Sequence, residues 1–267
     1  MSDGILSTGA HVISLGLAPT PIGYYSEVKG IDGYDITGAA IITASHNPKE
    51  YNGLKMTYNK QTLNEAQIKE VKDVTFDIWK DYNETSNSLN IIKYNIIPDY
   101  ISELTAKFQN AGSGVKVVVD SANATGGIVG PELYRKIGAE VIELFSQPDG
   151  NFPNHHPNPS VEKTLDTLKK VVVENQADIG IAYDGDSDRI GIIDSDGKFL
   201  TGDKLLLIYA TDLIQSDQYT KPTIVSEVKC SQVLYDEINR LGGIAVMCKT
   251  GHGYIKSMMK EKGALKL

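Results

Sequence analysis

Three aspartates follow one predicted buried strand at alternate positions, with a glycine and a serine between them. They are Asp184, Asp186 and Asp188. Their carboxylates can turn toward one point, where the charges would repel each other unless a cation neutralises them. A ligand set made only of oxygens favours Mg²⁺ or Mn²⁺ over Zn²⁺. The spacing therefore predicts a divalent-metal site, and Arg189 could clamp a phosphoryl group beside it through two hydrogen bonds.

Other loop types fit this segment less well. An EF-hand loop that starts at Asp184 needs glycine and glutamate where the chain has Arg189 and Ser195. A haloacid-dehalogenase loop needs threonine or valine at the position of Asp188. A solvated acidic turn without a metal remains an alternative.

A second polar loop, 43–48 (TASHNP), follows the apolar segment 38–42 (GAAII). Parallel α/β layers gather ligands at the carboxyl ends of strands, so both loops are expected at a site. In an extended loop, the side chains of Ser45 and His46 diverge, which argues against a nucleophile–base pair. We expect Ser45 to carry a phosphoryl group and to be a further ligand of the metal, with His46 as an acid or base. A serine turn that caps the loop, with His46 on the surface, is the alternative.

Three more side chains are candidates on weaker grounds. Lys55 lies shortly after the serine loop and could move a proton if burial or nearby positive charge tunes its pKa toward neutrality. A surface lysine on a strand is the favoured alternative for Lys55. Lys249 and His252 follow the apolar segment 244–248 and could face a substrate phosphate, or His252 could simply begin the next helix.

Two other segments are predicted to be structural. The loop 124–127 opens a helix and could hold an anion, but a pair of glycines is weak evidence. His155 and His156 lie among prolines in a rigid loop, where a metal site would lack a third ligand.

The elements that must position these loops form a weak internal repeat of an amphipathic helix end, a glycine and an apolar strand. The three copies are Ile5–Gly16, Tyr134–Phe145 and Ile238–Lys249. Gly9, Gly138 and Gly242 stand where a helix C-cap needs a left-handed residue. The repeating unit predicts α/β domains with parallel strands and right-handed crossovers, and the continuous apolar strands indicate burial on both faces. Generic α/β periodicity is the alternative to a true repeat.

The repeat also predicts domain boundaries. The polar segment 81–90 indicates a break near residue 95, and the turn 194–198 (DSDGK) indicates another near 199. We therefore expect domains at 1–95, 96–199 and 200–267. The first copy lacks its opening strand and the third its closing strand, so the chain is expected to be truncated at both ends.

Composition excludes several classes of partner. The 267 residues carry 26 basic and 34 acidic side chains, a net charge of −8, and no clustered basic run, which disfavours nucleic acid. No apolar stretch approaches the roughly 18 residues of a membrane span, and the first residues lack the pattern of a signal peptide. The two cysteines, Cys230 and Cys248, make no disulfide framework, so the expected location is the cytoplasm. The oligomeric state is not predicted.

Four segments, in the same order along the chain, resemble those of the α-D-phosphohexomutases. They are TASHNPKEYNGLK (43–55), similar to the phosphoserine loop; DGNFPNHHPNP (149–159), similar to a second-domain segment; DGDSDR (184–189), similar to the magnesium loop; and KTGH (249–252), similar to a third-domain substrate loop. The resemblance runs from about Gly4 to the last residue and is greatest to the bacterial phosphomannomutase/phosphoglucomutase group.

The resemblance implies tandem α/β domains with mixed, mostly parallel sheets covered by helices. It also implies an isomerase that interconverts the 1- and 6-phosphates of mannose or glucose through a phosphoserine and a bisphosphorylated sugar. The implied cofactors are Mg²⁺ and glucose 1,6-bisphosphate or mannose 1,6-bisphosphate.

On this resemblance, each candidate residue has an implied role. Ser45 is the phosphorylated residue, the three aspartates hold the metal, His46 and Lys55 are acid–base or phosphate-contacting groups, Arg189 lies beside the phosphoserine, and Lys249 contacts substrate.

The chain departs from the family pattern in several places. Ser187 replaces a glycine of the usual magnesium loop, which should be tolerated unless that position needs a positive φ. An N-terminal arginine motif, a third-domain sugar loop and the whole fourth domain are not found. We therefore expect little or no turnover from this chain alone, since distant binding groups orient the reacting phosphate. A non-catalytic remnant that binds Mg²⁺ or a phosphosugar, or a weak phosphatase, is the alternative.

Overall fold

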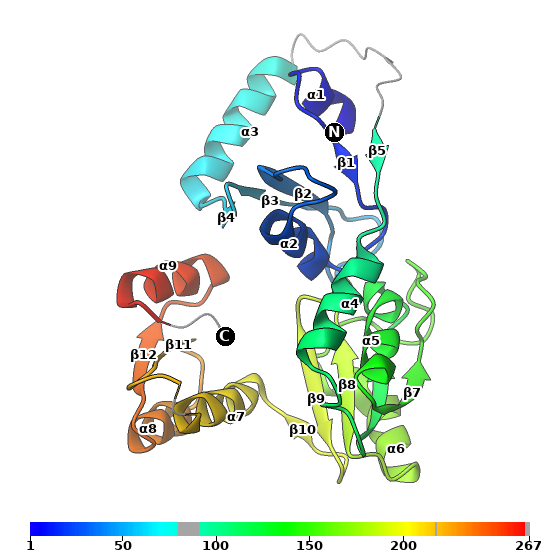
Figure 1. Ribbon diagram of the computed structural model, residues 1–267, viewed down its shortest axis with the longest axis vertical. Helices are drawn as coiled ribbons and strands as arrows, with labels where there is room; N and C mark the ends of the chain where they lie inside the picture. Colours follow the sequence, from blue (N-terminus) through cyan, green and yellow to red (C-terminus); the bar gives the residue numbers. More distant parts are fainter. Residues whose placement is uncertain (80–90, 217, 265–267) are drawn as a thin grey trace. The chain divides into compact units, whose positions relative to one another are not determined.

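The computed structural model describes residues 1–79, 91–216 and 218–264 (Figure 1). The chain divides into two compact units. The first contains residues 1–190 with 195–197, and the second contains 191–194 with 198–267. The predicted loop at 81–90 lies outside the described residues.

The N-terminal part of the first unit contains two small sheets. β1 (Ile13–Ser14) pairs in parallel with β5 (Ile92–Lys93). β2 (Gly38–Ile42), β3 (Leu54–Tyr58) and β4 (Gln61–Thr62) form an antiparallel sheet. The helices of this part are α1 (Ser2–Leu6), α2 (Thr20–Lys29) and α3 (Glu65–Trp79). α2 packs so closely on β2 that a Cβ added at Gly23 would lie 2.5 Å from the side chain of Ile41.

The first repeat copy therefore differs from the parallel arrangement expected of it. After β2, the chain turns through residues 43–53 and returns directly as β3, with Ile41 opposite Lys55. A direct return of this kind makes neighbouring strands antiparallel, whereas a parallel neighbour needs a crossover. The turn between β2 and β3 carries Ser45.

A five-stranded sheet has the order β10-β9-β8-β6-β7, and its strands β6, β7 and β8 belong to the first unit. Its strands are β6 (Lys116–Asp120), β7 (Glu140–Leu144), β8 (Ile179–Tyr183), β9 (Ile190–Asp194) and β10 (Phe199–Leu200). β6 pairs in parallel with both β7 and β8, and β9 forms an antiparallel hairpin with β10. Val117, Val118 and Val119 are buried without alternation, as expected for a strand covered on both faces.

Helices of the first unit cover this sheet and link it to the N-terminal part. They are α4 (Ile97–Lys107), the 3₁₀ turn η1 (Thr125–Ile128), α5 (Gly130–Lys136), the 3₁₀ turn η2 (Glu162–Leu165) and α6 (Asp166–Glu174). A buried cluster joins α2 to α4 and to the residue before α5. It contains Ile22, Ile31, Ile96, Ile101 and Val129. Burial of these side chains at roughly 1.5–3 kcal/mol each holds the two parts of the unit together.

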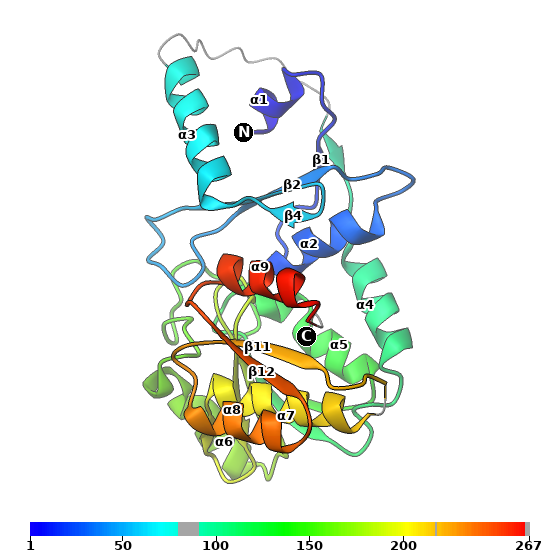
Figure 2. The ribbon, with the colours of Figure 1, turned by 90° about the vertical axis from the view of Figure 1, so that its left-hand side faces the viewer.

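The second unit is a smaller α/β layer. Besides β10 and most of β9, it contains α7 (Gly202–Gln215), β11 (Thr223–Glu227), α8 (Gln232–Arg240), β12 (Ile244–Cys248) and α9 (His252–Lys262). β11 and β12 are parallel, with α7 and α8 on one face and α9 on the other (Figures 1 and 2). Ala210, Ile224, Leu234 and Ile238 form its core.

The glycines of the three repeat copies have the predicted backbone conformation. φ is +84° at Gly9, +102° at Gly138 and +99° at Gly242. These angles lie in the left-handed region that ends helices and that glycine adopts without steric cost. The domain boundaries near residues 95 and 199 stay predictions.

Candidate active site

The loop after β2 presents Ser45 on a strained turn. The hydroxyl of Thr43 accepts a hydrogen bond from the backbone N–H of Ser45 at 2.8 Å, and the N–H of Thr43 donates to the carbonyl of Gly53. These bonds close the base of the loop. Ser45 itself has φ +56°, which is uncommon for a residue with a Cβ and is often found at functional sites.

The loop between β8 and β9 closes around the carboxylate of Asp184, which is fully buried. Its Oδ1 accepts the backbone N–H groups of Asp188 at 3.0 Å and Arg189 at 3.1 Å. Its Oδ2 accepts the Nε–H of Arg189 at 2.9 Å. The loop is therefore held in one shape by the first of its three aspartates.

The two loops meet at the hydroxyl of Ser45. Ser45 Oγ donates to Asp184 Oδ2 at 2.7 Å and accepts from Nη2 of Arg189 at 2.6 Å. Ser45 and Asp184 are 139 positions apart in the sequence, yet both belong to the first unit. We call the group formed by the two loops and β3 the serine–aspartate cluster. It consists of Ser45, His46, Lys55, Asp184, Asp186, Asp188 and Arg189.

His46 lies beside Ser45, and the expectation that their side chains diverge was wrong. Ser45 Oγ is 3.1 Å from His46 Nδ1, because the positive φ of Ser45 turns the chain and brings both side chains to one side. The hydroxyl proton of Ser45 nevertheless goes to Asp184, and the guanidinium of Arg189 also contacts His46 Nδ1. Burial and the positive charge of Arg189 lower the pKa of His46, which favours the neutral ring.

Lys55 reaches the cluster from β3 and is not the surface lysine that the sequence favoured. Its ammonium bridges Asp186 Oδ2 at 2.6 Å and Asp188 Oδ2 at 2.7 Å. Burial opposes the charge of Lys55, but hydrogen bonds to both carboxylates outweigh burial and raise its pKa. The pKa of Lys55 therefore moves away from the neutrality that the proton-transfer alternative required, since the neighbouring charges are negative.

The carboxylates of the cluster differ in their electrostatics. Burial raises the pKa of Asp184, although its hydrogen bond from Ser45 acts in the opposite direction. Burial also opposes ionisation of Asp186, but hydrogen bonds from Lys55 and Thr20 outweigh it and lower the pKa. Asp184 is therefore costly to ionise, whereas Asp186 is held in its ionised form.

The three aspartates fit a divalent cation. One oxygen from each carboxylate lies within 4.8 Å of the others, and among the described residues this is the one group of acidic, histidine or cysteine side chains with such spacing. Asp186 Oδ1 is buried and has no hydrogen-bond partner. A buried carboxylate oxygen without a donor is costly, and a bound cation would satisfy it. Oxygen ligands without nitrogen or sulfur fit Mg²⁺.

Lys249 and His252 belong to the second unit, which is described by itself. The ammonium of Lys249 lies 5.7 Å from the centre of the Tyr254 ring. His252 begins α9, as one of its two interpretations predicted. A role for either residue in substrate binding stays a prediction.

Sequence reasoning missed residues that hold the cluster in place. Thr20 binds Asp186, and Thr125 binds the carbonyl of Gly185 through its hydroxyl at 3.1 Å. In the loop predicted to be structural, His155 Nε2 lies 3.0 Å from the buried carboxylate of Asp120, which is not part of the cluster, and the ring of His156 lies edge to face with His46 at 6.0 Å. The prolines on either side of Thr20 and the predicted loop 124–127 were the available signals. Neither indicates a partner far along the chain.

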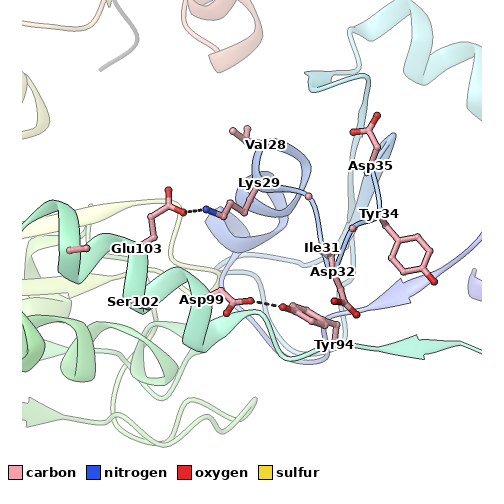
Figure 3. Close-up of a pocket in the computed structure, with 13 residues that line it drawn as sticks. Val28, Lys29, Ile31, Asp32, Tyr34, Asp35, Tyr94, Asp99, Ser102 and Glu103 are labelled. Atoms are coloured by element: carbon pink, nitrogen blue, oxygen red, sulfur yellow. Dashed lines mark hydrogen bonds and ion pairs between the residues drawn. The ribbon is translucent and has the colours of Figure 1, made fainter.

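A groove of about 730 Å³ lies elsewhere in the first unit, between the turn after α2 and α4 (Figure 3). Four of its polar side chains pair with each other. Lys29 Nζ lies 2.7 Å from Glu103 Oε2, and the hydroxyl of Tyr94 donates to Asp99 Oδ2 at 2.6 Å. None of its lining residues belongs to the serine–aspartate cluster, which therefore remains the candidate site.

Comparison with known families gives three consecutive matches. Residues 1–81, 98–197 and 201–266 match phosphoglucomutase/phosphomannomutase alpha/beta/alpha domains I, II and III. The chain belongs to the phosphoglucomutase/phosphomannomutase family. The family expected from the four sequence segments is thereby confirmed, and so is the expected fold of tandem α/β domains with mixed sheets.

Individual relatives agree with this membership. A phosphomannomutase/phosphoglucomutase of Pseudomonas syringae pv. tomato is 39% identical over 98% of this chain and 54% of its own length. A phosphoglucomutase of Neisseria meningitidis is 35% identical over 98% of this chain and 55% of its own. A crystal structure of a family protein from Burkholderia thailandensis superposes with a TM-score of 0.89 at 31% identity, covering 98% of this chain and 57% of that one.

The chain spans about half the length of the curated relatives it matches. Among the residues that the structure describes, none of the helices combines the length and apolar character needed to cross a membrane.

Proposed function

We propose that this chain carries the phosphoserine and metal-binding half of a phosphohexomutase active site, with Ser45 as the residue that accepts and returns the phosphoryl group. The observation that carries the proposal is the position of Ser45 Oγ, 2.7 Å from Asp184 Oδ2 and 2.6 Å from Nη2 of Arg189. A hydroxyl fixed between an acidic metal-type loop and a guanidinium suits phosphoryl transfer, because both neighbours act on phosphate charge.

The substrates proposed are the 1- and 6-phosphates of glucose or mannose, and glucose 1,6-bisphosphate or mannose 1,6-bisphosphate is the proposed intermediate and activator. The relatives named phosphomannomutase/phosphoglucomutase support this substrate class. Lys249 and His252 are proposed to contact the substrate from the second unit.

In the transfer, the free hydroxyl oxygen of the sugar phosphate bonds to the phosphorus while the bond between phosphorus and Ser45 Oγ breaks. The hydroxyl proton passes to a base of the chain. His46 suits that role, because its lowered pKa leaves a neutral ring next to Ser45. Ser45 Oγ takes up a proton as its bond to phosphorus breaks, and the proposed donor is Lys55, which Asp186 and Asp188 hold protonated.

In the second transfer, Ser45 Oγ loses its proton and bonds to the phosphorus of the other phosphate, while the bond between that phosphorus and the sugar oxygen breaks. The sugar oxygen takes up a proton, and the sugar leaves with its phosphate on the opposite carbon. Arg189 steadies the transferred group, since its guanidinium already contacts Ser45 Oγ. Asp184, Asp186 and Asp188 would hold Mg²⁺. When bound, this ion supplies partial neutralisation and polarisation of the phosphoryl oxygens.

Phosphoryl uptake by Ser45 can be tested separately from complete isomerisation. The purified chain is incubated with glucose 1,6-bisphosphate and Mg²⁺, and its intact mass is measured before and after. We expect a mass increase of one phosphoryl group, absent in Ser45→Ala and retained in Ser102→Ala, which changes an exposed serine on α4. Uptake by Ser45→Ala, or none by the unaltered chain, would contradict the proposal.

A chase separates the mutase from the alternatives. Addition of glucose 6-phosphate or mannose 6-phosphate should remove the phosphoryl group from Ser45 with formation of the bisphosphorylated sugar. Loss of the group at the same rate without sugar, with release of inorganic phosphate, would identify a phosphatase.

A further inference from the structure

Thr20 is the first residue of α2 and is 1% exposed, between Pro19 and Pro21. Its backbone N–H donates to the carbonyl of Asp186 at 2.8 Å, and its hydroxyl donates to Asp186 Oδ2 at 2.8 Å. The two bonds join residues 166 positions apart. One residue at the start of α2 thus fixes both the backbone and the carboxylate of the middle aspartate.

The two carboxylate oxygens of Asp186 have different surroundings. Oδ2 receives the hydroxyl of Thr20 and the ammonium of Lys55, the latter at 2.6 Å. Oδ1 is buried and has no partner. Rotation of this carboxylate about its Cβ–Cγ bond would turn Oδ1 away from a cation, and the hydrogen bond from Thr20 to Oδ2 opposes that rotation.

Threonine is well suited to hold the carboxylate of Asp186 in one orientation. Threonine is branched at Cβ, so its hydroxyl keeps few rotamers and stays in a fixed direction. The start of a ten-residue helix also favours a nearby negative charge, since its free N–H groups carry partial positive charge. Serine would keep the donor with more rotational freedom, and valine would keep the shape without the donor.

We propose that Thr20 is a positioning residue for Asp186. By binding Oδ2, Thr20 leaves Oδ1 as the oxygen that Asp186 presents to a divalent cation. The inference rests on the metal-binding part of the proposed function and adds to it the residue that orients the carboxylate of Asp186. Thr20 itself does not contact the cation.

The test is the affinity for Mn²⁺, measured on the purified chain by the loss of the free-ion signal in electron paramagnetic resonance. We expect Thr20→Val to weaken binding by about tenfold, the effect of one hydrogen bond to a charged group. Thr20→Ser should keep most of the affinity, because it keeps the donor. Asp186→Asn should abolish binding at this site.

Two further threonines provide matched controls. The hydroxyl of Thr105 on α4 is buried without a partner, so Thr105→Val tests the loss of a buried hydroxyl that binds nothing. Thr125 anchors the same aspartate loop through the carbonyl of Gly185, so Thr125→Val tests loosening of the loop without loss of a carboxylate contact. Thr105→Val should bind Mn²⁺ within about twofold of the unaltered chain, and Thr125→Val should lose less affinity than Thr20→Val.

Each outcome decides the inference. Unchanged affinity in a folded Thr20→Val variant overturns it, and so does an equal loss in Thr125→Val. If Thr20→Val does not fold, the comparison of Thr20→Ala with Thr20→Ser replaces it, with weaker binding expected of alanine. If the unaltered chain binds no Mn²⁺ at Asp186, the inference fails, while phosphoryl uptake by Ser45 still decides the proposed function.

Discussion

The backbone carbonyl of Ser45 lies so close to Gly185 that a Cβ on Gly185 would be 1.9 Å from the oxygen. No side chain can occupy that space, so glycine at position 185 allows the two loops to approach. The contact between Ser45 and Asp184 depends on this approach.

Replacement of Gly185 by alanine should force the two loops apart. We expect a loss of about 1–3 kcal/mol in the free energy of unfolding, typical of overpacking, together with a large loss of phosphoryl uptake by Ser45. Chemical denaturation and intact mass measure the two effects. Gly150→Ala is the control, since nothing lies within 4 Å of its added Cβ. Equal stability of the two variants would show that the loops do not meet in this way.

Ser187 occupies a left-handed position in the aspartate loop. Its φ is +60°, so the position is one where the glycine usual in the family avoids strain. Ser187→Gly and Ser187→Ala both remove the hydroxyl that lies 3.2 Å from Thr125 Oγ1. The glycine variant should be more stable than the alanine variant by about 1 kcal/mol in denaturant titrations, because it alone relieves the strain. If Ser187→Ala were more stable than Ser187→Gly, the left-handed conformation at position 187 would be contradicted.

The ammonium of Lys55 pairs with Asp186 and Asp188, so we expect it to compete with a divalent cation for their negative charge. Lys55→Met should bind Mg²⁺ several-fold more tightly and show a larger rise in melting temperature on addition of Mg²⁺. The rate of phosphoryl transfer by Lys55→Met should fall, since Lys55 is the proposed acid. Lys49→Met is the control, because Lys49 binds the neutral Asn151 at 2.7 Å. Weaker Mg²⁺ binding by Lys55→Met would refute the competition.

The pairing of His155 with Asp120 predicts a dependence of stability on pH. Burial opposes the charge of His155, but its hydrogen bond to Asp120 outweighs burial and raises the pKa above the ordinary value of about 6.5. The stabilisation is therefore complete below about pH 6.5 and is lost as the pH rises through the higher pKa of the folded state.

His155→Gln removes this dependence. The gap in melting temperature between the unaltered chain and His155→Gln should narrow between pH 6 and pH 9. His11→Gln, at an exposed histidine, should show no such narrowing relative to the unaltered chain. If the difference in melting temperature between the unaltered chain and His155→Gln widened with rising pH, His155 would be neutral in its pair with Asp120.

Several features of this protein could be predicted from local sequence. The alternation of Asp184, Asp186 and Asp188 was sufficient to predict a cluster of carboxylates, because a short loop after a buried strand can only turn its side chains to one edge. Gly138 and Gly242 marked the helix ends, since the left-handed conformation is a property of the residue itself. The four family segments identified the family for the same reason, as each is a local pattern.

Other features depended on contacts between distant segments. The sequence could not show that Lys55 pairs with Asp186 and Asp188, so it could not give the direction in which the pKa of Lys55 is shifted. The orientation of His46 depended on the φ of Ser45, which the loop adopts in the folded chain. Thr20 was not singled out, since its partner is 166 positions away.

The sequence alone determined which side chains could perform phosphoryl chemistry and the type of strand end that would carry them. Only the tertiary structure decided which of those side chains meet, which oxygen of Asp186 remains without a donor, and which charges surround His46 and Lys55. The physical reason is that residue type and local propensity act over a few residues. Distances between charges and hydrogen-bond partners are instead set by the packing of segments that are remote in the chain.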